Sequence, residues 1–322
     1  MVPDYRRSLK RHYSRLGLAL FLYMLATVAA EYAMQLLVAS FWPEFLDSGW
    51  YLVTLSFVPM YLIGFPVFLW ALPPAAPKEL RPPKQKLPGK LFFPLLLMCF
   101  GFLYPGNLIG QGLNEALSFL SCLLNSGSSG SGGNALEMLA SGSDLLPYSI
   151  VAVILGPLME EITFRKLLLD RMRTIDKPAA VFFSALAFGL FHGNVVQFFY
   201  AFGVGLLFGV IYIRTGKLWY SVALYMLVNF FGSVVTMLLL PQIDMLHPLD
   251  ALAPLLALGG YAMLLLTAAV AGVVLLIKHR KKLYVGDEYD RLRGMRFSTA
   301  FCTVGFTLYL LASIAVCAMA YI

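Results

Sequence analysis

The chain has 322 residues, of which 60% are hydrophobic and only 13% charged, and its mean hydropathy is +0.77. Soluble domains are about 45–50% apolar and about 25% charged, so this composition excludes a free soluble enzyme and a disordered tail protein. The formal net charge is +7, and the positions of the basic residues decide what that charge means.

Hydrophobic stretches follow one another along the chain with few charges inside them. They cover about 16–40, 50–72, 91–113, 145–170, 178–196, 198–213, 218–240, 253–277 and 297–320. A transmembrane helix needs ~20 apolar residues. We therefore predict an all-α polytopic membrane protein with about eight or nine transmembrane helices and a single transmembrane domain over 1–322.

Two connections have distinctive compositions. Residues 73–90 carry six prolines among five positive charges, which predicts an extended cytoplasmic linker. Residues 126–134 (SGSSGSGGN) predict a flexible outer connection. We interpret it as a slack tether; the alternative is a loop that admits a ligand from outside.

The basic residues fix the expected orientation. With the N-terminus in the cytoplasm, all 24 Lys and Arg residues fall on, or just into the membrane from, the inner side. Because Lys and Arg accumulate in cytoplasmic loops, we predict a cytoplasmic N-terminus and an outer C-terminus. The basic clusters then indicate topology and contact with anionic lipids of the bilayer, and no nucleic-acid partner is expected.

Ionisable side chains inside the spans are costly and are therefore functional candidates. They are Glu31, Glu160, Glu161, Arg165 and His192. Glu31, with Gln35 one turn later, reads as a polar packing contact.

The sequence LMEEITFRK places Glu161 and Arg165 four residues apart, so they share a helix face and can pair. Glu160 is rotated ~100° from Glu161 and keeps a free carboxyl group, which suits a general base. The alternative is a cluster of these three residues that only fastens helices together.

Two further pairs have the same spacing of four residues. Phe188 and His192 share one face, and Tyr225 and Asn229 share another, where a hydroxyl and an amide can donate hydrogen bonds. A lone histidine or amide in a span is also commonly a packing residue or an interhelical contact.

Counting residues from the nearest cytoplasmic turn gives the depth of each group. Glu160 lies ~16 Å, His192 ~22 Å, Asn229 ~18 Å and Tyr225 ~12 Å from that turn at ~1.5 Å per residue. In a ~30 Å hydrocarbon layer these depths permit convergence at one internal cavity.

These motifs resemble a known family. Glu160-Glu161-x-x-x-Arg165 followed by Phe188-x-x-x-His192 is similar to the signature of the CAAX protease and bacteriocin-processing (CPBP or ABI) family of intramembrane glutamic proteases. The resemblance covers roughly 145–235. It implies accessory N-terminal spans over 1–143, a catalytic core over 144–240 and C-terminal spans over 241–322.

The resemblance also implies roles for these residues. Glu160 would activate a water that attacks the scissile carbonyl, with His192 assisting, while Glu161, Arg165 and Phe188 support the site. The family's last motif is His-x-x-x-Asn, whose side chains hold the oxyanion. Here Asn229 matches the Asn, and Tyr225 stands where the His is expected.

No cofactor is expected. His192 is the only one of four histidines inside a span, whereas a catalytic zinc commonly takes three protein ligands, usually with two or more His. Water activated by Glu160 is the simpler hypothesis, and zinc is disfavoured.

The leading interpretation is an intramembrane endopeptidase that cuts a membrane-embedded or lipid-modified peptide or protein, through a cavity open toward the cytoplasmic leaflet. In the family such activity serves CAAX processing, peptide maturation or bacteriocin immunity, and we expect a prokaryotic plasma membrane. Tyr225 favours the alternative of a catalytically inactive scaffold or immunity-type peptide-binding protein. A proton-coupled transporter using Glu160 and His192 is a third reading, against which stands the absence of recognisable repeats.

Overall fold

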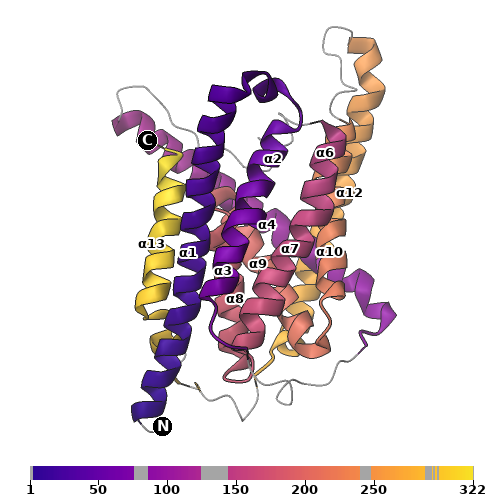
Figure 1. The fold of residues 1–322 in the computed structure, drawn as a ribbon. Helices are drawn as coiled ribbons and strands as arrows, with labels where there is room; N and C mark the ends of the chain where they lie inside the picture. The colour runs from indigo at the N-terminus through magenta and orange to yellow at the C-terminus, as the bar shows by residue number, and fades with distance from the viewer. Residues whose placement is uncertain are drawn as a thin grey trace.

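The computed structural model describes residues 3–75, 86–124, 144–239, 248–286, 292, 294–295 and 297–321. Within these residues all regular structure is helical and no strand is present, which confirms the predicted all-α class (Figure 1). The predicted tether 126–134 and most of the proline-rich linker lie outside the described residues. Residues 73–75 and 86–88 of that linker are not helical, as expected, whereas Gly89 and Lys90 begin the 3₁₀ turn η4, where the prediction of an extended chain was wrong.

The regular elements are bounded as follows, with η marking 3₁₀ and π segments. In chain order they are α1 (Pro3–Phe41), η1 (Pro43–Asp47), α2 (Tyr51–Phe57), η2 (Val58–Gly64), α3 (Phe65–Ala71), η4 (Gly89–Leu91), α4 (Phe92–Leu124), α6 (Leu145–Ser149), η5 (Ile150–Leu155), α7 (Gly156–Glu161), η6 (Ile162–Leu168), η7 (Leu169–Arg171), α8 (Lys177–Phe191), α9 (Val195–Thr215), α10 (Trp219–Asn229), η8 (Phe230–Val234), α11 (Val235–Leu239), α12 (Pro248–Leu283), η10 (Phe297–Phe301) and α13 (Val304–Met319).

Seven helical runs among the described residues are long and apolar enough to cross a membrane. They are Arg6–Phe41, Tyr51–Ala71, Gly89–Leu123, Leu145–Arg171, Val195–Thr215, Trp219–Leu239 and Leu252–Leu283. The shorter apolar helices α8 and α13 correspond to the two remaining hydrophobic stretches of the sequence. The chain is thus an integral, multi-pass membrane protein.

Helix α9 forms the centre of the bundle. It packs against α4 on one side and α8 on another, and most of its residues are buried. A Cβ atom at Gly205 would lie 3.2 Å from the Ala185 Cα, and one at Gly209 would lie 3.0 Å from a methyl of Val181. These glycines therefore let α9 approach α8 closely, as small residues do between membrane helices.

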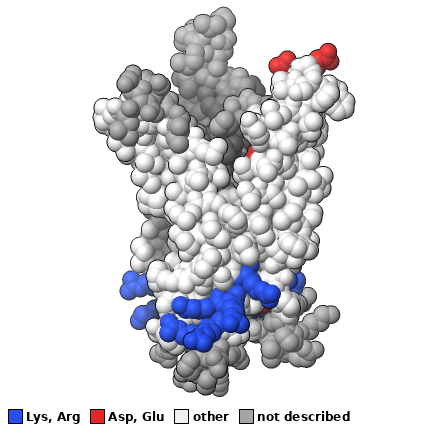
Figure 2. Space-filling model, turned by 60° about the vertical axis from the view of Figure 1, so that its left-hand side comes forward, with Lys and Arg blue, Asp and Glu red and all other residues white. Residues whose placement is uncertain are grey.

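Basic side chains gather at one end of the molecule. Figure 2 shows Lys and Arg in a band near that end, which is the end that holds the N-terminus in Figure 1, whereas the C-terminus lies toward the opposite end. We call it the basic end. Contacts made by Arg171 hold it together: Nε donates to Pro73 O at 2.6 Å, and the Arg171 carbonyl oxygen lies 3.0 Å from the Nε2 of His12. The charge rule predicts that this end faces the cytoplasm.

Candidate functional site

The two adjacent glutamates lie in the run Leu145–Arg171, where the helix departs from α geometry. The short α7 carries Glu160 and Glu161 and is flanked by the π segments η5 and η6. Further π segments, η2 and η8, occur in the runs Tyr51–Ala71 and Trp219–Leu239. Such segments are rare and frequently occur at functional sites, because the extra residue per turn redirects side chains.

Glu161 pairs with Arg165 inside the protein. Their charged atoms lie 3.0 Å apart and neither side chain has exposed surface, so the predicted ion pair is present. Arg165 Nη1 also donates to Ser184 Oγ at 3.2 Å, which joins η6 to α8. The guanidinium lies 5.0 Å from the ring centre of Phe188 and 5.8 Å from that of Phe208, within cation–π range.

Glu160 has a different environment from its neighbour. Its side chain is only partly buried, and its Oε2 accepts a hydrogen bond of 2.7 Å from the Tyr225 hydroxyl. This contact joins α7 to α10. The cavity described below is lined by both residues.

His192 ends α8, and its ring is held in one orientation. Its Nδ1 lies 2.8 Å from the carbonyl oxygen of Phe188. A carbonyl oxygen only accepts, so Nδ1 carries the proton and Nε2 of the neutral ring keeps its lone pair. The backbone then turns at Gly193, whose φ of 64° lies in the left-handed region that favours glycine.

Phe188 lies among the site residues and packs on three of them. Its ring centre is 4.9 Å from that of His192 and 5.9 Å from that of Tyr225, both edge to face. Its face also meets the Arg165 guanidinium. Phe188 thus supports the imidazole and the phenol from the side of the buried ion pair.

The two candidate oxyanion donors are both engaged. Asn229 Nδ2 donates to the Ala152 carbonyl oxygen at 2.7 Å, and the Tyr225 hydroxyl donates to Glu160 as described. Each donor must therefore exchange its partner before it can serve a substrate oxygen.

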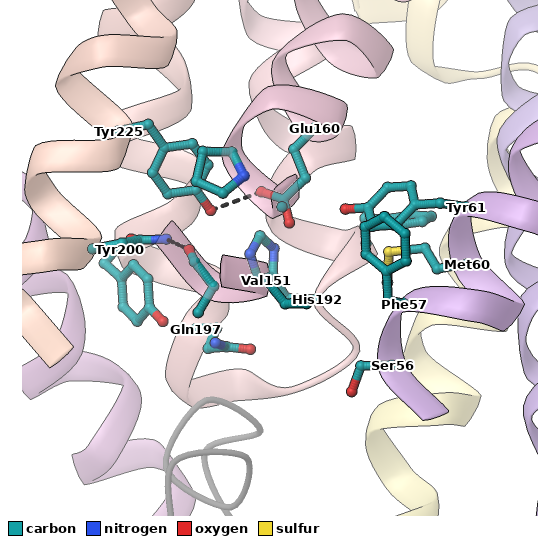
Figure 3. A pocket seen from close by; sticks show the side chains of 15 residues that line it. Ser56, Phe57, Met60, Tyr61, Val151, Glu160, His192, Gln197, Tyr200 and Tyr225 are labelled. Atoms are coloured by element: carbon teal, nitrogen blue, oxygen red, sulfur yellow. Dashed lines mark hydrogen bonds between the residues drawn. The ribbon is translucent and has the colours of Figure 1, made fainter. Parts of the chain in front are cut away.

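The structure brings Glu160, His192, Tyr225 and Asn229 to one cavity of about 200 Å³, as the depth estimates permitted. Figure 3 shows the His192 imidazole and the Glu160 carboxylate directed into it. The other lining residues are Ser56, Phe57, Met60, Tyr61, Val151, Ala152, Gly156, Pro157, Phe191, Gln197 and Tyr200.

Several of these lining residues were not singled out in the sequence. Tyr61 comes from the second hydrophobic stretch, and its hydroxyl points toward Glu160 in Figure 3. No local pattern marks it, since a tyrosine in a span is unremarkable. Gln197 had a usable signal: Asn194-x-x-Gln197 is a helix-capping pattern, and Asn194 Nδ2 donates to Gln197 Oε1 at 2.6 Å.

The residues that line the cavity come from different depths of the bundle. Glu160 and Tyr225 line it from the halves of their spans nearest the basic end, whereas Ser56, Val151 and Gln197 lie farther from that end. Counting residues along the helices could not show which side chains leave this space unfilled.

Among the described residues, no three His, Cys, Asp or Glu side chains are grouped so that they can hold a metal ion. The polar groups of the cavity are instead a carboxylate, an imidazole, amides and hydroxyls. This set suits proton transfer and hydrogen bonding to a polarised carbonyl group.

Comparison with known proteins gives one finding. Residues 142–231 match the family model described as Type II CAAX prenyl endopeptidase Rce1-like. The searches against curated proteins and against solved structures gave no match. The matched segment holds Glu160, Glu161, Arg165, His192, Tyr225 and Asn229, and it forms most of the cavity. The resemblance that the motifs indicated is therefore confirmed for this part of the chain: residues 142–231 are similar to the Rce1-like CAAX protease family.

Proposed function

We propose that this protein is an intramembrane endopeptidase in which Glu160 activates a water molecule that hydrolyses a peptide bond. The observation that carries the proposal is the placement of one partly exposed carboxylate beside an oriented imidazole in a cavity within the membrane. The match of residues 142–231 to a family of endopeptidases supports it.

In the proposed reaction Glu160 is the general base. Its Oε2 is held by Tyr225, so Oε1 remains to accept a proton from water. The water oxygen attacks the carbonyl carbon, and the proton passes to Glu160. His192 Nε2 holds the same water through its lone pair. When the C–N bond breaks, the proton on Glu160 moves to the leaving nitrogen.

Tyr225 and Asn229 would stabilise the oxyanion. A neutral carboxylic acid accepts hydrogen bonds less strongly than a carboxylate. When Glu160 takes up the proton, the Tyr225 hydroxyl is therefore released toward the oxygen that has become negative. The Asn229 amide gives up its hydrogen bond to the Ala152 carbonyl and donates to the same substrate oxygen. Oxyanion stabilisation and proton transfer are thus linked through one hydrogen bond.

The remaining residues would hold this arrangement without touching substrate. The buried Glu161–Arg165 pair and Phe188 fix η6 against α8 and α9. No metal takes part in the proposed mechanism, since Glu160 itself generates the nucleophile.

We further propose that the substrate is a membrane-embedded or lipid-modified peptide or protein, as in CAAX processing or bacteriocin-related peptide maturation, and that the site of action is a prokaryotic plasma membrane. The family description and the position of the cavity within the spans support a membrane-associated substrate.

A second candidate is a catalytically inactive scaffold or bacteriocin-immunity-type protein that binds a peptide in the same cavity. The observation that favours it is Tyr225, which replaces the expected His and whose hydroxyl donates a hydrogen bond to the Glu160 carboxylate. Such a protein would keep its biological effect when Glu160 is replaced by Gln.

Mass spectrometry of membrane and released peptides separates the two candidates. Cells with the native protein are compared with cells carrying Glu160→Gln at matched expression, and with Glu44→Gln as a control on an exposed acid outside the cavity. Peptides present with the native protein and Glu44→Gln, and absent with Glu160→Gln, support proteolysis. Three identical peptidomes contradict it.

A further inference from the structure

One wall of the cavity comes from outside the segment that matches the family. The run Tyr51–Ala71 supplies four lining residues, which are Ser56, Phe57, Met60 and Tyr61. The family match begins at residue 142, so it covers none of them. Among the four, Tyr61 is placed to take part in chemistry, because its hydroxyl points toward the Glu160 carboxylate in Figure 3.

The Tyr61 side chain is held in place by its neighbours. Only 7% of the residue is exposed. Phe57, four residues earlier, packs on the phenol, with the two ring centres 4.8 Å apart. Tyr61 itself lies in the π segment η2, which packs against α1. These contacts fix the ring, so the direction of its hydroxyl is set before any ligand binds.

The Tyr61 hydroxyl has no hydrogen-bond partner among the described residues. Two other donors of the cavity differ in this respect: the Tyr225 hydroxyl donates to Glu160, and the Asn229 amide donates to the Ala152 carbonyl oxygen. A buried donor that stays unpaired is destabilising. A hydroxyl that faces a cavity in this way is therefore expected to bind water or a ligand there.

The Tyr61 hydroxyl is directed at the place where the reacting groups would meet. Tyr225 holds Oε2 of Glu160, which leaves Oε1 for the water that Glu160 would activate. The carbonyl group attacked by this water must lie next to it, in the same cavity. A hydroxyl that points toward this carboxylate can donate to the carbonyl oxygen as that oxygen becomes negative, which is how a donor stabilises an oxyanion.

Tyr61 differs from the two donors of the family motif in when it is available. Tyr225 is released only after Glu160 has taken up the proton, and Asn229 must first give up its bond to Ala152. Tyr61 has no such bond to break. Donors that are already in place cost no reorganisation during the reaction and are the most effective. Tyr61 can therefore polarise the carbonyl group before the water attacks.

We propose that Tyr61 is a further catalytic residue, whose hydroxyl donates a hydrogen bond to the scissile carbonyl oxygen and stabilises the oxyanion. This role rests on the proposed function, because it needs a peptide carbonyl attacked by water. The phenol keeps its proton throughout. The water oxygen bonds to the carbonyl carbon, the water proton passes to Glu160, and that proton moves to the leaving nitrogen when the C–N bond breaks. Tyr61 thus supplies from another span the ready donor that is missing where Tyr225 replaces the expected His.

The test compares Tyr61→Phe with the matched control Tyr32→Phe. Tyr32 lies on α1, is 64% exposed and does not line the cavity. Both changes remove one hydroxyl and keep the ring. Native protein, the two variants and Glu160→Gln are reconstituted in vesicles with a substrate identified from the peptidome comparison, and kcat and KM are measured. The melting midpoint of each protein is measured in detergent.

We expect kcat to fall ~10²–10³-fold in Tyr61→Phe, which is the effect of losing one oxyanion donor. KM should stay within about twofold of native, because the hydrogen bond acts mainly in the transition state. The melting midpoint should stay within a few degrees of native, since the ring and its packing on Phe57 are kept. Tyr32→Phe should match the native protein in all three measurements.

A native kcat in Tyr61→Phe, beside an inactive Glu160→Gln, overturns the role of Tyr61 and leaves the proposed function intact. A raised KM with a native kcat also overturns it, because Tyr61 would then only bind the substrate. So does a fall in kcat together with a lower melting midpoint, which is the result expected of a packing residue. Equal product from native protein and Glu160→Gln contradicts the proposed function itself, and the role of Tyr61 fails with it.

Discussion

Two neighbouring glutamates of α7 have opposite environments. Glu161 has no exposed surface and lies 3.0 Å from the charged group of Arg165, which also contacts Ser184 and two aromatic rings. Glu160 faces a cavity and is held by one tyrosine hydroxyl. A helix rotates ~100° per residue, so a single step in sequence separates a structural ion pair from a carboxylate available for chemistry.

An ionisable residue within a membrane can be accommodated in two environments. It is neutralised inside the protein, as Glu161 is, or it meets water or a ligand in a cavity, as Glu160 does. The same substitution at the two positions should therefore separate an effect on activity from an effect on stability.

The largest effect on activity is expected from Glu160→Gln. The amide keeps the shape and still accepts from Tyr225, but it cannot take a proton from water. Since general base catalysis contributes up to ~10⁴-fold, product formation should fall by about that factor. The melting temperature of the purified protein in detergent should stay within a few degrees of native, and a collapse of the fold would show that Glu160 is a packing residue instead.

Glu161→Gln should have the complementary effect. Removing one charge of a buried pair leaves the other uncompensated, which costs ~3–5 kcal/mol of stability. The melting midpoint in detergent should therefore fall well below that of Glu160→Gln. The double variant Glu161→Gln/Arg165→Met removes both charges and should recover part of the loss. Equal melting midpoints for Glu160→Gln and Glu161→Gln would contradict the view that only Glu161 has a structural role.

His192→Asn removes one function of the ring and keeps another. An asparagine amide can still donate to the Phe188 carbonyl, as Nδ1 does, but it lacks the Nε2 lone pair that would hold water. We expect a loss of about 10²-fold in product formation, at the lower end of general acid–base effects, with little change in melting temperature.

His12→Asn provides the control for this change, because that histidine lies at the basic end, where it contacts Arg171 O. It should leave the rate of product formation unchanged. A rate equal to native in His192→Asn as well would exclude a role for Nε2.

The smallest effect is expected at Tyr225. Histidine is shorter than tyrosine and does not reach Glu160, so Tyr225→His frees the carboxylate and supplies the donor of the family motif. Activity should rise about tenfold, which is ~1.4 kcal/mol in the barrier. Tyr225→Phe, which only removes the hydroxyl, should lower it. If neither variant changes the rate of product formation, Tyr225 does not act on the oxyanion.

Much of the fold could be predicted because the bilayer imposes its constraint locally. Each span is a run of apolar residues of a set length, so nine stretches could be recognised without knowledge of how they pack. The pairing of Glu161 with Arg165 is local as well, since residues four apart share a helix face.

Features that depend on contacts between distant segments could not be predicted. The hydrogen bond from Tyr225 to Glu160 joins residues 65 positions apart, and Tyr61 belongs to a span with no motif of its own. The shape of the cavity depends on how five separate helical segments pack and on which rings fill the space beside Arg165. Neither is encoded in one periodic pattern.

If Glu160 activates water to cleave a peptide bond, the oxygen of that water must appear in the product, and isotope labelling measures this. Native protein and Glu160→Gln are reconstituted in vesicles with a substrate identified from the peptidome comparison, in water enriched in ¹⁸O, and the product is weighed by mass spectrometry. We expect one ¹⁸O atom in the new C-terminal carboxylate with the native protein and no product with the variant. Equal product from both proteins, or a native product without the label, would contradict it.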